Sequence, residues 1–354
     1  MANRKSLLVG SLPFKNEKEA MELAVEALHD SLISLPDGEI GEKTEQYPEG
    51  SRTAWAMNVI DMCIADSTNW DIVQEGKLLP NGFPVDYDTL YKLRPKHSPE
   101  EIAKYLNFGY FDTYMKSYHL YQELRKKKNL QNVPFQVGVP TGMAMSLHML
   151  EPENIFRYFD AFNERLAYEM NQIIDYTNND IVIQIECPAE IGLVYANPPQ
   201  VEFAISSILG LVNRLNNSVK IGIHFCYGDL NNKALVRPET LERMTDFANA
   251  FISQWPKNKE LSYIHFPLAE GNEGPRLNSD YYKPLGKIQL PKHTRFVAGF
   301  VHEKRNADEL KQILHHIESI RKHEVDVACS CGMGRRKAEV GLQLMTLMKQ
   351  LVEA

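Results

Sequence analysis

A histidine and a cysteine stand two residues apart in the segment His224-Phe225-Cys226, and a further cysteine occurs at Cys331, before a glycine. Residues i and i+2 of a strand share one side, so both can reach one point where the strand ends. One imidazole and two thiolates suit Zn²⁺ with a fourth position left for water or substrate. The types and spacing predict a zinc site at His224, Cys226 and Cys331, with Cys329 competing with Cys331 for the third place.

Carboxylates and one more histidine are the other candidates for chemistry. Glu186 ends an apolar run, so we expect it to be buried and to need a partner. The acidic cluster Asp37, Glu39 and Glu42 is suited to hold an ammonium group, the alternative being a solvated loop. His302 is either a general acid or an ordinary loop histidine.

Eight short apolar runs must position these residues. They are apolar on both faces and are followed by longer amphipathic stretches, which is typical of buried parallel strands in βα units. Eight such units close a (β/α)8 TIM barrel. A doubly wound open sheet is the alternative, but the first turn, VGSLPF, lacks its glycine-rich fingerprint. The runs lie near 6–9, 32–35, 135–139, 181–185, 219–223, 261–266, 295–300 and 325–328, and the helical patterns near 17–31, 98–128, 152–178, 198–217, 238–254, 306–323 and 334–352, with only a short stretch near 278–286 after the sixth run.

A barrel places its chemistry at the carboxyl ends of its strands, where all of these candidates fall. Residues 38–97 form a long excursion after the second run, which we interpret as an insertion over the barrel mouth. The whole chain, 1–354, is then expected to form one domain.

Composition excludes several other classes of protein. The chain has 354 residues, 44% of them hydrophobic and 24% charged, which is ordinary for a folded enzyme. A net charge of −7 argues against a nucleic-acid partner, and no apolar run is long enough for a membrane span or a signal peptide. Five cysteines are too few for a disulfide scaffold, so we expect a cytoplasmic protein with reduced thiols.

Four short motifs, in order and at predicted strand ends, resemble the cobalamin-independent methionine synthase family, specifically its C-terminal catalytic barrel. The similarity extends over nearly the whole chain. It rests on Val9-Gly10-Ser11-Leu12-Pro13 (IGSFP in the family), Ile185-Glu186-Cys187-Pro188 (IDEP), His224-Phe225-Cys226-Tyr227 (HMCY) and Cys331-Gly332-Met333-Gly334-Arg335-Arg336 (DCGLKTR).

The resemblance implies a zinc ion on His224, Cys226 and Cys331 that takes up a thiol, homocysteine in the family, as thiolate. The thiolate then attacks a methyl group carried by a folate. The resemblance also implies roles around this centre: Gly10 and Ser11 meet the carboxylate of the amino acid, Glu39 and Glu186 meet its ammonium, and His302 assists proton delivery.

Two departures from the family pattern change the expectation. The family's fourth zinc ligand is a glutamate of the sixth strand, where this chain has His265, so we expect His265 to be the fourth ligand. The loop 138–142 lacks the tryptophan expected beside a pterin, which argues against folate as the donor. The expected reaction is methyl or alkyl transfer to a thiol, and the sequence assigns neither the thiol, the donor nor the oligomeric state.

Two other functions are compatible with the same residues. One is a metal-free decarboxylase of the uroporphyrinogen-decarboxylase type, which would use Asp37, Arg335 and Arg336 on an acidic substrate. The other is a barrel that binds a metal or a small molecule without catalysis.

Overall fold

Eight parallel strands form the central sheet of the computed structural model, which describes residues 4–39, 55–80, 84–217 and 219–354. Their order is β1-β10-β9-β8-β7-β6-β5-β2. From β2 to β10, each strand of this sheet therefore lies beside the strand that follows it in the chain, and the last strand lies beside the first. All eight predicted runs are strands. The strands are β1 (Ser6–Leu7), β2 (Leu35–Pro36), β5 (Phe135–Pro140), β6 (Ile181–Glu186), β7 (Lys220–His224), β8 (Glu260–Pro267), β9 (Arg295–Val301) and β10 (Asp326–Cys329).

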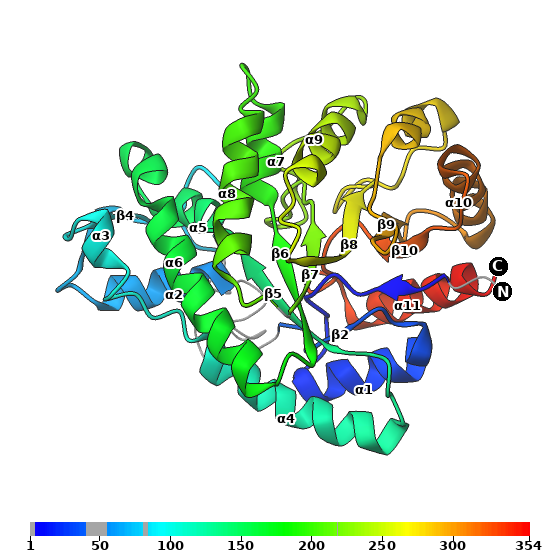
Figure 1. The fold of residues 1–354 in the computed structure, drawn as a ribbon, viewed down its shortest axis with the longest axis horizontal. Coiled ribbons are helices and arrows are strands. Elements are labelled where there is room, and N and C mark those ends of the chain that lie inside the picture. The colour runs from blue at the N-terminus through cyan, green and yellow to red at the C-terminus, as the bar shows by residue number, and fades with distance from the viewer. Residues whose placement is uncertain (1–3, 40–54, 81–83, 218) are drawn as a thin grey trace.

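The two edges of this sheet meet through one contact. Ser6 of β1 forms a parallel bridge with Leu32, just before β2, and the Ile33 amide donates to the Ser6 carbonyl at 2.9 Å. The sheet therefore curls back on itself, with the helices outside it (Figure 1). The chain ends also meet, because Arg4 Nη1 donates to the Leu351 carbonyl at 2.8 Å. The predicted TIM-barrel fold is confirmed.

Helices follow the strands where amphipathic patterns predicted them. Asparagine side chains cap two of them: Asn16 accepts from the Glu19 amide, and Asn306 forms a capping box with Glu309. After β8 there is only the 3₁₀ helix η3 (Ser279–Lys287), with Pro284 inside it. The others are α1 (Glu17–Leu28), which runs into η1 (His29–Ser31), α3 (Pro99–Ile102), α4 (Tyr110–Lys128), α6 (Pro152–Tyr176), α8 (Val201–Arg214), α9 (Glu242–Ser253), α10 (Ala307–Arg321) and α11 (Ala338–Val352).

Two short helices are absent from the sequence prediction, α5 (Gly142–Met149) and α7 (Pro188–Tyr195). Each starts directly after a strand, and both are apolar nearly all round, so neither shows the one-sided period that marks a surface helix. They lie at the carboxyl ends of β5 and β6, where side chains of a barrel site are expected.

The described part of the insertion contains α2 (Trp55–Ala65) and an antiparallel pair, β3 (Trp70–Gln74) and β4 (Lys92–Pro95). It contacts the loops that follow the barrel strands. Leu93 bridges Leu150, which follows α5, and the Leu230 amide donates to the Tyr87 hydroxyl at 3.0 Å. These contacts place the segment over the loops after β5 and β7, while Glu42 lies outside the described residues. The single-domain interpretation stays a prediction.

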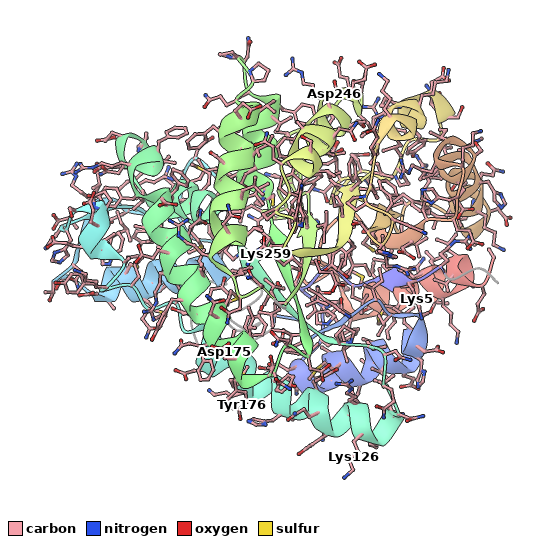
Figure 2. All side chains as sticks on the ribbon, in the orientation of Figure 1. Lys5, Lys126, Asp175, Tyr176, Asp246 and Lys259 are labelled. Carbon is pink, nitrogen blue, oxygen red and sulfur yellow. The ribbon has the colours of Figure 1, made fainter. Side chains whose placement is uncertain are left out.

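Apolar side chains fill the space between the sheet and the helices, while charged residues such as Lys126 and Asp246 point away from it (Figure 2). The barrel interior also holds a polar layer. Tyr263 Oη donates to Gln184 Oε1 at 3.0 Å, and Gln136 Nε2 donates to the Val9 carbonyl at 2.9 Å. Among the described residues no helix is both long and apolar enough to cross a membrane.

Candidate metal centre and adjoining cavity

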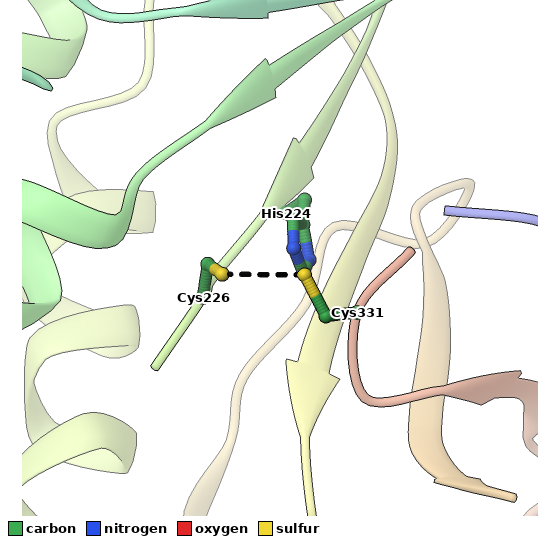
Figure 3. A group of neighbouring side chains, drawn as sticks. All are labelled: His224, Cys226 and Cys331. Carbon is green, nitrogen blue, oxygen red and sulfur yellow. Dashed lines mark hydrogen bonds between the residues drawn. The ribbon is translucent and has the colours of Figure 1, made fainter. Parts of the chain in front are cut away.

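His224, Cys226 and Cys331 meet at the carboxyl end of the barrel. His224 ends β7, Cys226 follows two residues later, and Cys331 comes from the loop after β10. One ligand atom from each lies within 4.8 Å of the others, and the two sulfur atoms are 3.6 Å apart (Figure 3). Cys329 ends β10 and is buried in the core. The structure thus brings together the predicted trio, with Cys331 rather than Cys329 as its third member.

The hydrogen bonds of His265 determine which nitrogen of His224 is available. His265 Nε2 lies 2.9 Å from the Cys329 carbonyl oxygen, which can only accept, so Nε2 carries the proton. Burial lowers the pKa of His265 to about 4, so the ring is neutral and its Nδ1 is an acceptor. That atom lies 2.7 Å from His224 Nδ1, which must therefore donate. The lone pair of His224 is left on Nε2.

His224 Nε2 is buried and has no hydrogen-bond partner among the described residues. An orphaned buried nitrogen is costly unless something else occupies its lone pair. Burial also lowers the pKa of His224 well below its usual value, which keeps the ring neutral. A neutral imidazole with a free lone pair, beside two thiols, is a donor set that a soft divalent metal ion fits.

The strand register explains why the two histidines meet. In the parallel ladder His224 of β7 is paired with His265 of β8. The neighbouring strand β9 makes room for the second ring with a glycine, because a Cβ at Gly299 would lie 2.4 Å from His265 Nε2. His265 was predicted as a fourth ligand; in the structure its ring nitrogens lie 2.7 Å from His224 Nδ1 and 2.9 Å from the Cys329 carbonyl oxygen, and its role as a ligand stays a prediction.

The Cys331 thiol is protonated in the absence of a metal. The hydrogen bond to Cys226 and burial raise its pKa well above its usual value, while the nearby Arg335 has the opposite effect. Arg335 also pairs with Asp229, Nη1 to Oδ2 at 3.1 Å. This ion pair connects the loop that carries Cys226 with the loop that carries Cys331.

A cavity opens beside the three metal-ligating candidates. Gly10, Ser11, Glu39 and Glu186, all predicted to bind substrate, line it together with Cys226 and Cys331. Asp37 is different. It is fully buried, and its Oδ1 accepts from the Glu39 amide at 2.8 Å. Since Glu39 has a left-handed backbone (φ 51°), Asp37 supports the turn that presents the Glu39 side chain.

Two carboxylates converge inside the cavity. A Cβ at Gly138 would lie 2.6 Å from Glu39 Oε1 and 3.2 Å from Glu186 Oε1, and a Cβ at Gly10 would lie 2.7 Å from Glu39 Oε1. Glycine at these two positions is what leaves space for both side chains. Burial raises the pKa of Glu186 to about 7, and Gln184 and Arg335 oppose that rise. A pair of converging carboxylates is suited to a cationic group such as an ammonium.

Ser11 and His302 have structural contacts that the sequence did not indicate. Ser11 Oγ accepts from the Gly334 amide at 3.2 Å, and its carbonyl accepts from the Met333 amide at 2.7 Å, so Ser11 fixes the loop after Cys331. His302 does not line the cavity described here. Its Nδ1 accepts from the Lys304 amide at 3.1 Å, and its Nε2 donates to the Gly271 carbonyl at 3.3 Å.

Several cavity residues were not among the predicted site residues. Tyr87 comes from the insertion, Tyr110 and Tyr114 from α4, and His148 from α5. Of these, only His148 could have been found from the sequence, because it closely follows the end of a predicted strand. Finding it would have required the prediction of helix α5, which carries it. Arg335 was considered in the sequence only as part of the loop after Cys331 and in the decarboxylase alternative.

Comparisons with known proteins support the fold. No family model matches the chain, and no curated protein sequence does. Among solved structures, a B12-independent methionine synthase from Shewanella sp. W3-18-1, in complex with selenomethionine, aligns with a TM-score of 0.58 and 13% identity over 98% of this chain and 96% of that one. A methyltransferase from Methanosarcina mazei aligns with a TM-score of 0.47 and 10% identity over 100% and 95%. The first of these shares the fold.

Proposed function

We propose that the chain is a zinc-dependent methyltransferase that methylates a thiol substrate. The observation that carries the proposal is the free Nε2 of His224, a residue that lies beside two thiols at the edge of a cavity that also contains a carboxylate pair. Imidazole and thiolate ligands favour zinc among common metal ions. The four motifs that resemble the cobalamin-independent methionine synthases support the same reaction class.

When bound, zinc supplies the Lewis acidity that lowers the pKa of a substrate thiol, ordinarily ~8.5, so that a thiolate exists at neutral pH. The residues of the chain orient the reactants. His265 holds the His224 ring, Ser11 holds the Cys331 loop, and Glu39 and Glu186 bind an ammonium group of the substrate. The thiolate sulfur attacks the methyl carbon of the donor, the carbon–donor bond breaks, and its electron pair leaves with the donor group.

Aromatic and apolar side chains also line the cavity. Tyr87, Tyr110 and Tyr114 line the described cavity, together with Met145 and Leu147, and no tryptophan does so among the described residues. The proposal of a donor other than a folate rests on the missing tryptophan in loop 138–142.

The metal-free decarboxylase alternative finds less support. It requires Asp37, Arg335 and Arg336 to face an acidic substrate. Asp37 is instead fully buried against the Glu39 amide, and Arg336 Nε is paired with both carboxylate oxygens of Glu303, at 3.0 and 3.1 Å. Only Arg335 of the three lines the cavity.

Zinc content and thiol binding test the proposal. We expect about one zinc per chain in the wild type, and loss of zinc in Cys226→Ser and Cys331→Ser. Cys187→Ser is the matched control, because Cys187 is also buried but lies outside the metal-binding group. Titration of the zinc-loaded protein with thiols should release protons as thiolate forms. A folded protein that takes up no zinc, or a zinc protein with which no thiol releases protons, contradicts the proposal.

A further inference from the structure

The Arg335 guanidinium has unused hydrogen-bonding capacity inside the cavity. Its side chain lines the cavity and is 23% exposed. Nη1 donates to Asp229 Oδ2, and none of the other guanidinium N–H groups has a hydrogen-bond acceptor among the described residues. A guanidinium carries five N–H donors in a planar fork, so most of its capacity is free to meet a ligand.

Arg335 is held firmly in place beside the metal centre. It follows Cys331 by four residues, and the two hydrogen bonds that the Met333 and Gly334 amides donate to Ser11 fix the loop between them. Asp229, which is buried, holds the guanidinium from the other side. Arg335 lines the same cavity as the carboxylate pair and the two thiols, so its positive charge faces the space that they share.

We propose that Arg335 is the specificity residue that binds a carboxylate on the thiol substrate. This inference rests on the proposed function. Resemblance to the synthases places a substrate carboxylate at Gly10 and Ser11, and Arg335, which lines the same cavity, adds a charged donor there. An arginine fork binds a carboxylate through two parallel charge-assisted hydrogen bonds. The cavity then recognises a thiol that carries an ammonium, at Glu39 and Glu186, and a carboxylate, at Arg335.

Two thiols that differ only in the carboxylate provide the test. We would load the protein with Co²⁺ and follow the thiolate-to-cobalt absorption band while adding L-homocysteine or 3-aminopropanethiol. Charge-assisted hydrogen bonds of this type predict that the wild type binds homocysteine roughly 10- to 150-fold more tightly. Arg335→Gln should lose this preference by weakening only homocysteine binding, and Arg335→Lys should retain part of it.

Controls separate recognition from folding and from the metal. Arg237→Gln, at an exposed arginine paired with Glu270, should behave as the wild type. Thermal melting and cobalt content per chain should be the same for wild type and Arg335→Gln. If Arg335→Gln weakens both thiols equally, or neither, or if the wild type does not prefer homocysteine, the assignment of Arg335 is overturned. The ligands Cys226 and Cys331 give this band from the start, so if neither thiol changes it in the wild-type protein, the proposed function itself fails, and the role of Arg335 fails with it.

Discussion

Replacement of His265 tests the geometry of the metal centre most directly. His265 is fully buried, accepts from His224 Nδ1 and donates to the Cys329 carbonyl. His265→Phe fills a similar volume and removes both hydrogen bonds. It leaves two buried polar groups without partners, at ~1–3 kcal/mol each, so we expect the metal-free protein to lose ~2–6 kcal/mol of unfolding free energy. His265→Asn keeps an acceptor near the position of Nδ1 and should lose about half as much.

The same change alters zinc affinity for a different reason. Without an acceptor at His265, nothing holds the proton of His224 on Nδ1, and the proton competes with zinc for Nε2. Loss of such a supporting hydrogen bond typically weakens metal binding by roughly 10- to 100-fold. We therefore expect His265→Phe to show this loss, and His265→Asn to remain near the wild type.

Chelator competition measures the zinc affinity of each variant, and chemical denaturation of the metal-free proteins measures stability separately. The reasoning is refuted if His265→Phe binds zinc as tightly as the wild type. It is also refuted if His265→Asn loses zinc as completely as Cys226→Ser, because His265 would then be a ligand, as the sequence predicted, rather than a supporting residue.

Three further predictions concern other parts of the barrel. Glu190 is fully buried, and burial raises its pKa to about 7 from 4.5, so its stabilising contribution is complete below pH 4.5 and is lost as the pH rises through 7. Denaturation should show Glu190→Gln gaining ~2–3 kcal/mol relative to wild type between pH 4 and pH 8, and a constant difference would contradict this. Gly332→Ala places a Cβ 2.2 Å from Ser11 Oγ and should cost ~1–3 kcal/mol and weaken zinc binding. Adding Ser11→Gly should restore part of both, because it removes the clash but also the hydrogen bond from the Gly334 amide, and no recovery at all would show that the clash is elsewhere. His302→Phe removes two hydrogen bonds to backbone groups, so it should lower the melting temperature while chelator competition shows unchanged zinc affinity.

Much of the fold follows from local patterns in the chain. The hydrophobic pattern of each apolar run, and of the amphipathic stretch that follows it, is contained within a short segment. Strands and helices can therefore be predicted from that segment alone, without knowledge of the residues that pack against it. The short helices α5 and α7 were not predicted, because they are buried on most sides and show no helical period in their hydrophobic residues. Tyr87 was not predicted as a cavity residue, because it reaches the cavity from a long insertion whose path no local sequence pattern specifies.

The sequence by itself determined which residue types stand at the strand ends: the His224-x-Cys226 pair at the end of β7, Glu186 at the end of β6, and two cysteines at and just after the end of β10. Only the tertiary structure decided how they are used. The register of β7 with β8 turns His265 toward His224 as a hydrogen-bond partner. The loop after β10 brings Cys331 to 3.6 Å from Cys226, while Cys329 stays in the core. Ligand geometry depends on distances between segments more than a hundred residues apart, and those distances are set by barrel closure and packing.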